Sequence, residues 1–585
     1  MSSSPHRDLN AAPPHAPATD FVPAKLDATK WANIEALYTA LLQRPVTSAA
    51  DLEQWLLDRS ELDAACSESR ANLYINMTCH TDDEKIQAAW SAYLDEVPTK
   101  LKPIWFELDR RQAAFFESIP MDPRRYEVLK RNSALAVELF RPENVALETK
   151  LSKLNTEYEK LCGEMTVTFR GQDKTLPQMG KFLQEPDRPT RQDAWKTIWD
   201  RRLKDRDAIS DIYDKQIALR HQIAVNAGFS NYRDYQHRAS RRFDYTPEDC
   251  FAFHEAIEKH CVPFMRKLDE RRQKALAVDP LRPWDLSVDE KSRAPLHPFE
   301  GGQQLIERTR AVFNAMDPQL AGFFNRLGDD GTPADCFDLE SRKGKAFGGY
   351  QYMRDRSRIP FIFMNAAGLH RDVETMVHEA GHAFHSFLCA DEPLLELRDY
   401  PTEFAEVASM SMELLSMPYW DAYYPDKSHA DRARREQLEG SLSILPWVAT
   451  IDAYQHWVYL NPNHSRAERT AQWLALMDRF GHAVSWEDLD EERAYNWQGQ
   501  GHLFGHAFYY IEYGIAQLGS LGIWLHSLER GPAEAIKLYK RAMKLGGSRP
   551  LPELFAAADL PFDFGPDIVG RLVAAVEKEL AKLPE

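Results

Sequence analysis

The stretch that decides the fold is DVETMVHEAGHAFHSFL, residues 372–388. Its apolar residues recur at intervals of three and four, which is the spacing of one face of an α-helix. They are Val373, Met376, Val377, Ala380, Ala383, Phe384 and Phe387. Asp372 and Glu374 lie near the start, where the positive end of a helix dipole favours negative charge. The sequence therefore predicts a buried helix over 372–388.

Two histidines and a glutamate within this helix form an HExxH pattern. His378 and His382 are four residues apart, so their imidazoles lie one turn above each other and can hold one metal ion. Glu379 is turned by about 100° from His378, so it can reach a water molecule beside the ion without binding the ion itself. The pattern predicts one Zn²⁺ per chain, with two histidine ligands and a general base.

The alternative is a helix with two incidentally placed histidines and a surface glutamate. The apolar flanks disfavour it, because buried imidazoles and a buried carboxylate need partners. Gly381 also costs a helix about 1 kcal/mol relative to alanine. That cost is understandable if another segment must approach the helix closely at this glycine.

A catalytic zinc site normally has three protein ligands, so a third is expected. His385 shares a face with His378 and His382, but we expect it to pack against the ligands more readily than to be one. The stretch YPTEFAEVASMSMELL offers three glutamates near one another on a helix face: Glu403, Glu406 and Glu413. Spacing alone does not choose between Glu403 and Glu406.

A second group of polar side chains follows in NWQGQGHLFGHAFYYIEYGIAQLG, residues 496–519. Its members are His502, His506, Tyr509, Tyr510 and Tyr513. Phenols and imidazoles can donate hydrogen bonds to a developing oxyanion, although aromatic packing at a helix interface is the alternative. The glycines of this stretch form a GxGxxxG pattern, but no strand precedes it, so we reject a dinucleotide site.

The rest of the chain has mainly helical periodicity, with Pro98 and Pro103 as expected breaks or kinks. A strand pair is expected within 165–177, with Gly171 in the turn. Two further strands are expected at 345–355 and 358–365, directly before the HExxH helix. We expect a disordered tail over 1–22, an N-terminal helical region over 23–150 and a catalytic region over 151–585.

Composition narrows the class of protein. The 585 residues include 72 Lys and Arg against 89 Asp and Glu, a formal charge of −17 that argues against nucleic-acid binding. Seven scattered cysteines, never spaced as CxxC, make a disulfide framework unexpected and favour a reducing compartment, which we take to be the cytoplasm. No apolar run approaches the length of a membrane span.

VHEAGHAFHSF, followed some 20 residues later by TEFAEVASMSMELL, resembles the thimet oligopeptidase and oligoendopeptidase F family of zinc peptidases, and the oligoendopeptidase F branch most. GGYQ at 348–351, IPFIFMN at 359–365 and HLFGHAFYYIEYGIAQLG at 502–519 support the resemblance, which covers roughly 160–560. It implies a mainly α fold, with two helical lobes flanking a deep channel and a small β-sheet beside the HExxH helix. It also implies short unfolded peptides as substrates.

The resemblance further implies roles for individual residues. Glu406 becomes the third zinc ligand, while His502 and the pair Tyr510 and Tyr513 stabilise the oxyanion. Ala507 stands where the thimet branch has a tyrosine, so this chain departs from the pattern of that branch at this position. The strand at Gly348, Gly349 and Tyr350 would pair with an extended peptide, by composition and by family likeness.

The expected function is therefore that of a zinc-dependent oligoendopeptidase, which cleaves internal bonds with Glu379 as general base. A dipeptidyl carboxypeptidase-type exopeptidase would share every metal ligand and is the nearest alternative. A non-catalytic peptide-binding protein on a decayed peptidase fold is the other, and intact His378, Glu379 and His382 disfavour it.

Overall fold

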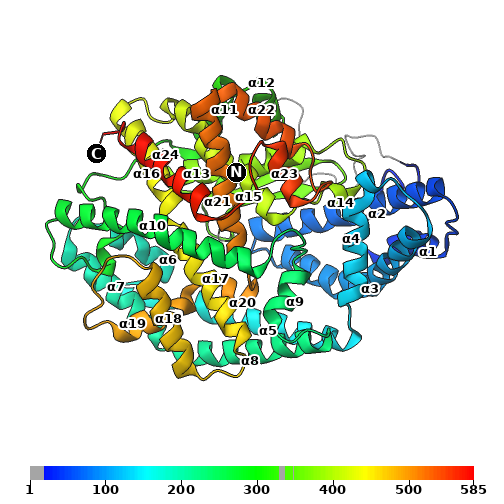
Figure 1. The fold of residues 1–585 in the computed structure, drawn as a ribbon, viewed down its shortest axis with the longest axis horizontal. Coiled ribbons are helices and arrows are strands. Elements are labelled where there is room, and N and C mark those ends of the chain that lie inside the picture. The colour runs from blue at the N-terminus through cyan, green and yellow to red at the C-terminus, as the bar shows by residue number, and fades with distance from the viewer. Residues whose placement is uncertain (1–18, 329–335, 347, 585) are drawn as a thin grey trace.

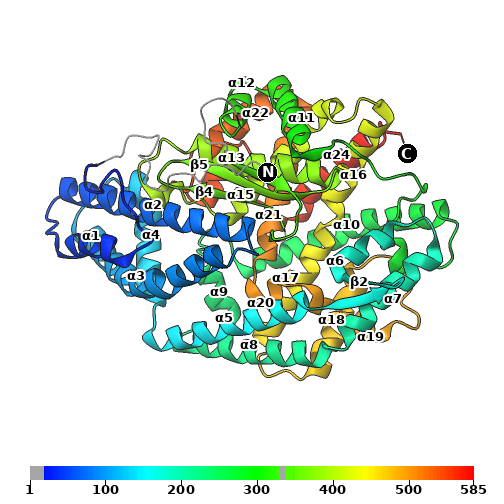
Figure 2. The ribbon, with the colours of Figure 1, turned by 180° about the vertical axis from the view of Figure 1, so that it is seen from behind.

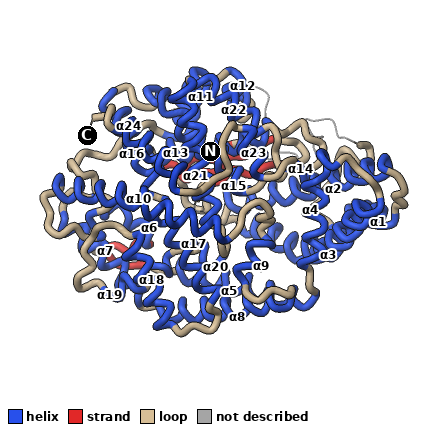
Figure 3. The backbone as a smooth tube through the Cα atoms, in the orientation of Figure 1, coloured by secondary structure: helices blue, strands red, loops and turns tan. Residues whose placement is uncertain are grey.

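The computed structural model describes residues 19–328, 336–346 and 348–584, so most of the expected tail over 1–22 lies outside the described residues. Helices dominate these ranges, and strands are confined to two small sheets (Figure 3). The expected mainly α fold, with a small sheet beside the HExxH helix, is confirmed. No described helix combines the length and apolar character needed to cross a membrane.

The N-terminal part of the chain is a group of long helices, blue to cyan in Figure 1. These are α1 (Trp31–Gln43), α2 (Ala49–Cys79), α3 (Glu84–Ser118), α4 (Pro123–Leu139) and α5 (Pro142–Gly163). Helices α1 to α4 have a hydrophobic core of their own, which includes Trp55, Leu101 and Phe116. The predicted division at residue 150 falls inside α5, and it stays a prediction.

The prolines of α3 do not end that helix, so of the expected breaks or kinks no break occurs, and a kink at either proline stays a prediction. Pro98 and Pro103 both lie in its interior, where a proline costs about 3 kcal/mol because it removes a backbone hydrogen bond. Val97 and Leu101, next to these prolines, are buried in the N-terminal core. Packing of this apolar face therefore offsets the local cost.

A hairpin and a run of helices follow in the chain, and the last two of these helices, α11 and α12, pack against the HExxH helix. The elements are β1 (Thr166–Phe169), β2 (Gln172–Thr175), α6 (Leu176–Met179), η1 (Gly180–Gln184), α7 (Arg188–Leu203), α8 (Arg206–Asn226), α9 (Tyr232–Ala239), α10 (Pro247–Ala275), η2 (Pro283–Asp285), α11 (Gly301–Met316) and α12 (Pro318–Asn325). Arg170 and Gly171 both have positive φ in the two-residue turn, as a type I′ hairpin requires. The predicted strand pair is thus confirmed.

The second sheet has three strands: β3 (Phe337–Glu340), β4 (Tyr350–Arg354) and β5 (Ile359–Ala366). Their order is β3-β5-β4, with β4 antiparallel to β5 and β3 parallel to it. Residues 359–364 of β5 are buried, which explains their unbroken apolar run. Figure 2 shows β4 and β5 beside the HExxH helix, α13 (His370–Leu388).

The remaining helices complete the main core. They are α14 (Leu395–Arg398), α15 (Thr402–Ser416), η3 (Met417–Ala422), α16 (Lys427–Ser443), α17 (Leu445–Leu460), α18 (Arg466–Phe480), α19 (Asp490–Ala494), η4 (Asn496–Gly499), α20 (His502–Gly505), α21 (Tyr510–Arg530), α22 (Pro532–Met543), α23 (Leu551–Ala557) and α24 (Pro566–Leu580). Helix α15 packs between α13 and α21, in the middle of the molecule (Figure 1). This arrangement brings the two predicted functional stretches to one region.

The short helix α14 belongs to the N-terminal core although it lies between α13 and α15 in the chain. Leu394 and Leu397 are buried among the residues of α1 to α4. The Leu395 N–H donates to Ser60 Oγ at 2.7 Å, and Arg125 pairs with both oxygens of Glu392 at 2.7 and 2.8 Å. The connection between α13 and α15 is thus anchored in the N-terminal helices.

Candidate active site

The HExxH helix α13 and helix α15 approach each other closely at Gly381. A Cβ at this glycine would lie 2.6 Å from Ser409 Cα and 2.7 Å from Ala408 O. Tyr539 joins the two backbones here, because its hydroxyl lies 3.3 Å from both Gly381 O and Ala408 O. The expected close approach of another segment at this glycine is therefore confirmed.

Three of the predicted ligands converge across this contact. His378 Nε2 lies 3.4 Å from Glu406 Oε2, and His382 Nε2 lies 3.6 Å from the same oxygen. The three ligand atoms all fall within 4.8 Å of one another. Ligand atoms about 2.0–2.2 Å from a tetrahedral zinc ion lie about 3.3–3.6 Å apart, so the arrangement and the donor set both fit this metal.

The electrostatics of Glu406 and His382 favours the forms that bind metal. Burial raises the pKa of the Glu406 carboxyl, but His382, His378 and the Ser409 hydroxyl outweigh it and lower the pKa to about 2. Burial lowers the pKa of His382 to about 4, so its imidazole is neutral at physiological pH. A carboxylate and a neutral imidazole are thus ready to donate electron pairs.

Glu413, the third glutamate of the α15 face, contacts the other nitrogen of His378. Its Oε1 lies 2.6 Å from His378 Nδ1, and its Oε2 accepts a hydrogen bond from Gln437 Nε2 at 2.8 Å. Burial lowers the pKa of His378, but the hydrogen bonds with Glu406 and Glu413 outweigh it and raise the pKa well above its usual value. Glu413 therefore orients the imidazole so that Nε2 faces the other ligands.

Glu379 lies between the metal-ligand group and the edge strand β4. Burial raises its pKa to about 7, because the opposing effects of His378 and of a hydrogen bond with the Gln351 backbone are smaller. A Cβ at Gly349 would lie 3.9 Å from Glu379 Oε1 and 3.2 Å from Thr375 Cγ2. The predicted substrate strand thus begins directly beside the predicted base.

Two other candidates lie outside the ligand group. Glu403 turns toward Tyr245, whose hydroxyl donates to Glu403 Oε1 at 2.8 Å. The ring of His385 is buried and stacks on Tyr400, with centroids 3.5 Å apart and planes at 10°. The geometry therefore favours Glu406 over Glu403, and it gives His385 a packing position.

The second polar group gathers around His502. Gln500 Nε2 lies 2.8 Å from His502 Nδ1, and the Tyr510 hydroxyl donates to Gln500 Oε1 at 3.1 Å. The centroid of the Tyr513 ring lies 6.1 Å from the centroid of the His502 ring. The structure thus brings His502, Tyr510 and Tyr513 together, but a glutamine engages the hydroxyl of Tyr510.

Tyr509 is a candidate that the sequence reasoning did not select. Its ring lies 5.1 Å from that of Tyr513, and the two hydroxyls share a hydrogen bond. Burial raises the pKa of both phenols, and the nearby charge of Glu406 raises both further. Tyr509 and Tyr513 are four residues apart, a spacing that places side chains on one helix face and was the available signal.

A pocket of about 370 Å³ adjoins this tyrosine pair. Its lining comes from α5, α8, α9 and the α20–α21 segment and includes Asn155, Gln236, His506 and Tyr509. The pocket provides space for a ligand next to the phenol of Tyr509.

Comparisons with known proteins agree with this geometry. Residues 181–563 match the model of peptidase family M3. The chain belongs to that family. It superposes on the structure of PZ peptidase A with inhibitor 2 at a TM-score of 0.85, with 28% identity over 95% of this chain and 98% of the other. A structure assigned as an oligoendopeptidase F gives 0.86, with 28% identity over 97% and 99%.

Curated relatives match more locally. The oligoendopeptidase F homolog of Lactococcus lactis subsp. lactis (strain IL1403) is 25% identical over 219 residues, which are 32% of this chain and 35% of the relative. The chain thus matches about a third of the length of this relative. The predicted resemblance to the oligoendopeptidase F branch is confirmed, and M3 membership places the chain in the metallo-oligopeptidase class.

Proposed function

We propose that this M3 chain is a zinc-dependent oligoendopeptidase that hydrolyses internal bonds of short, unfolded peptides. The observation that carries the proposal is the convergence of His378, His382 and Glu406 within 4.8 Å of one another, with buried Glu379 beside them. Two imidazoles and a carboxylate are a donor set of zinc hydrolases. The cytoplasmic location stays a prediction.

One zinc ion held by His378, His382 and Glu406 would polarise the scissile carbonyl and lower the pKa of a water molecule. Glu413 Oε1 contacts Nδ1 of His378, the ring nitrogen that would not bind the metal, and this contact fixes the direction of Nε2. Ser409 Oγ donates to Glu406 Oε2 at 2.9 Å and so fixes the carboxylate. Each of these ligands is therefore oriented by a second side chain or by helix packing.

Glu379 is the proposed general base. Its carboxylate accepts the proton of the attacking water and then passes that proton to the leaving amine. A pKa near 7 suits both steps, since the group can be ionised before attack and protonated afterwards. A bound dication would lower this pKa and so favour the ionised form at the start of the reaction.

His502, Tyr510 and Tyr513 are the proposed donors to the oxyanion, and we add Tyr509 to them. The influence of the Glu406 charge on Tyr509 and Tyr513 supports a position close to the reacting carbonyl. Phenols whose pKa is raised by burial keep their protons at neutral pH, so they can donate a hydrogen bond to negative oxygen.

The edge strand β4 is the proposed docking place of the substrate backbone. Only β5 pairs with it among the described strands, and Gly348 and Gly349 are exposed at its start. An extended peptide that added to this edge would run past Glu379. Bulky substitutions at Gly348 and Gly349 should therefore weaken peptide binding, and normal affinity would count against this role.

The test of the function is metal analysis combined with peptide digestion, with and without a chelator. We expect about one zinc per catalytic site and chelator-sensitive cleavage in the middle of internally quenched peptides whose ends are blocked. Cleavage only of free-ended peptides, two residues from the C-terminus, would favour the exopeptidase alternative. If the protein bound metal but hydrolysed no peptide, the result would favour the alternative of a non-catalytic peptide-binding protein.

A further inference from the structure

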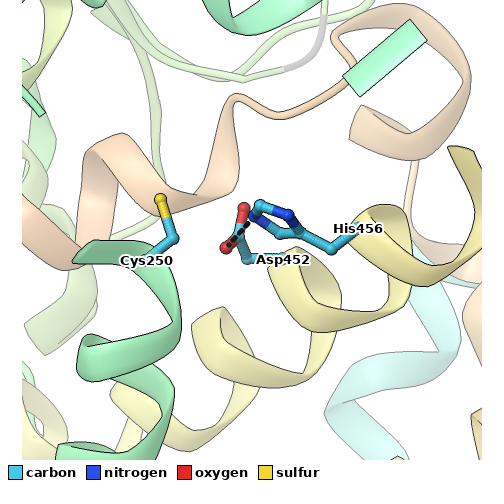
Figure 4. Close-up of side chains that lie close together, drawn as sticks. All are labelled: Cys250, Asp452 and His456. Carbon is cyan, nitrogen blue, oxygen red and sulfur yellow. Dashed lines mark ion pairs between the residues drawn. The ribbon is translucent and has the colours of Figure 1, made fainter. Parts of the chain in front are cut away.

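A second group of potential metal ligands lies between α10 and α17, outside the active site. Cys250 comes from α10, while Asp452 and His456 lie one turn apart on α17 (Figure 4). One ligand atom from each residue falls within 4.8 Å of the others, and all three side chains are buried. Sulfur, oxygen and nitrogen donors thus lie close together in the protein interior.

The hydrogen bonding of this group is incomplete. Asp452 Oδ2 lies 2.8 Å from His254 Nε2 and 3.3 Å from His456 Nε2. Asp452 Oδ1 and His456 Nδ1 are buried and have no hydrogen-bond partner among the described residues. Because an unpaired buried carboxylate oxygen is costly, the group has an unused capacity to bind a cation.

The charge balance is suited to a divalent ion. A divalent ion with one thiolate, one carboxylate and one neutral imidazole forms a group of zero net charge, which lowers the cost of burial. Binding forms a metal–sulfur bond and breaks the S–H bond, and the proton leaves to solvent.

We propose that Cys250, Asp452 and His456 bind a second transition-metal ion of the zinc type, with a structural role. Thiolate and imidazole donors favour Zn²⁺ over Mg²⁺ or Ca²⁺, which prefer oxygen ligands. His254 orients the Asp452 carboxylate, as outer hydrogen-bond partners commonly do at zinc sites.

The position of the group gives this ion a defined structural effect. Gln455 Oε1, next to His456 on α17, accepts a hydrogen bond from the Phe508 N–H at 2.7 Å. The ring of His456 lies 5.3 Å from that of Phe508, which has a φ of +65°. The ion would cross-link α10 and α17 behind the segment that joins His502 to Tyr509.

The test uses the full-length double variant His378→Ala/His382→Ala, which removes the catalytic ligands and leaves the second group. After dialysis against Zn²⁺ and then metal-free buffer, mass spectrometry should find one zinc per chain. Loading with Co²⁺ should give a thiolate-to-cobalt absorption band in the near ultraviolet. The catalytic group contains no thiol, so this band cannot come from it, whether or not the proposed function is correct.

Cys250→Ser in the same background should lose the band and nearly all of the metal. Cys261→Ser is the matched control, because Cys261 is also fully buried on α10 but belongs to no cluster of metal ligands found among the described residues. Equal metal content in the two serine variants would overturn the proposal. So would a double variant that binds no metal, or that binds Co²⁺ without a thiolate band, and these readouts hold even if Cys250→Ser does not fold.

Discussion

Glu413 Oε1 lies 2.6 Å from His378 Nδ1, which places a carboxylate directly behind a proposed zinc ligand. The other oxygen of Glu413 accepts a hydrogen bond from Gln437 of α16 at 2.8 Å. The His378 imidazole on α13 is thus held by Glu413 of α15, and Glu413 in turn is held by Gln437 of α16. Such outer carboxylates fix the tautomer of a ligand histidine and increase its basicity.

Removal of this carboxylate should weaken metal binding without abolishing it. We expect Glu413→Ala to lower zinc affinity by about 10–100-fold and Glu413→Gln by less, since the amide oxygen can still accept from Nδ1. Competition with a chromogenic chelator measures this affinity. Glu374→Ala, one turn before His378 on the same helix, is the control and should bind zinc as the wild type does. An unchanged affinity in Glu413→Ala would contradict the orienting role.

Glu379→Gln should separate metal binding from chemistry. The amide is close to isosteric but cannot accept a proton, so we expect normal zinc content and a kcat lowered by about 10²–10⁴-fold or more. Metal analysis and the hydrolysis of a quenched peptide are measured on the same preparation. A variant that kept substantial activity would show that Glu379 is not the base.

Tyr509, Tyr510 and Tyr513 should contribute to kcat by different amounts. Tyr509→Phe and Tyr513→Phe should each lower kcat by about 10²-fold, with little change in KM, because their hydroxyls serve the transition state. Tyr510→Phe should have a smaller effect, since Gln500 engages its hydroxyl. Steady-state kinetics of the three variants decides the order. A larger loss in Tyr510→Phe than in Tyr509→Phe would restore the pair that the sequence suggested.

Gly381→Ala should destabilise the protein. The added methyl group would lie 2.6 Å from Ser409 Cα, so α13 and α15 must move apart at a cost of about 1–3 kcal/mol. Gly440→Ala in α16 is the matched control, because nothing lies within 4 Å of its added Cβ. That variant should be more stable by about 0.5–1 kcal/mol. Urea unfolding measures both, and equal stabilities would refute the steric argument.

The pH dependence of stability should report on Glu512. Burial and the nearby Glu403 raise its pKa from 4.5 to about 7, although Arg242 opposes this. The folded protein therefore binds this proton more tightly than the unfolded chain. The resulting stability is complete below pH 4.5 and is lost as the pH rises to about 7, by up to about 1.4 kcal/mol per pH unit.

Glu512→Gln is the matched variant for this effect, because its amide oxygen can still accept from Arg242. Urea unfolding between pH 5 and 8, in chelator so that metal binding does not contribute, should give a flatter profile for the variant. Parallel profiles for the two proteins would assign the pH dependence to other groups.

Local patterns in the sequence were enough to predict the elements that carry the site. The helical repeat of 372–388 predicted α13, and the two strands before it are β4 and β5. The i, i+4 spacing of His378 and His382 fixed their common direction, because a helix leaves little choice at that range. The strand pair β1 and β2 followed from equally local turn chemistry.

Contacts between distant segments could not be predicted in the same way. Glu403 and Glu406 are equivalent by spacing, and only the packing of α15 against α13 turns Glu406 to the histidines. Whether Tyr509 or Tyr510 faces Glu406 depends on where α21 begins and on its rotation. Cys250 and Asp452 lie far apart in the chain, so nothing local indicated their proximity. The continuity of α3 through its prolines could not be predicted for the same reason, because packing against distant segments offsets their local cost.

The anchoring of α14 in the N-terminal helices has a thermodynamic consequence for the metal. His378 and His382 precede this anchor and Glu406 follows it, so a displacement of α1 to α4 strains the geometry of all three. By linkage, the proposed zinc ion and the arrangement of the N-terminal helices would stabilise each other to the same degree. Saturation with zinc should therefore slow hydrogen exchange in α2, at amides remote from the ion.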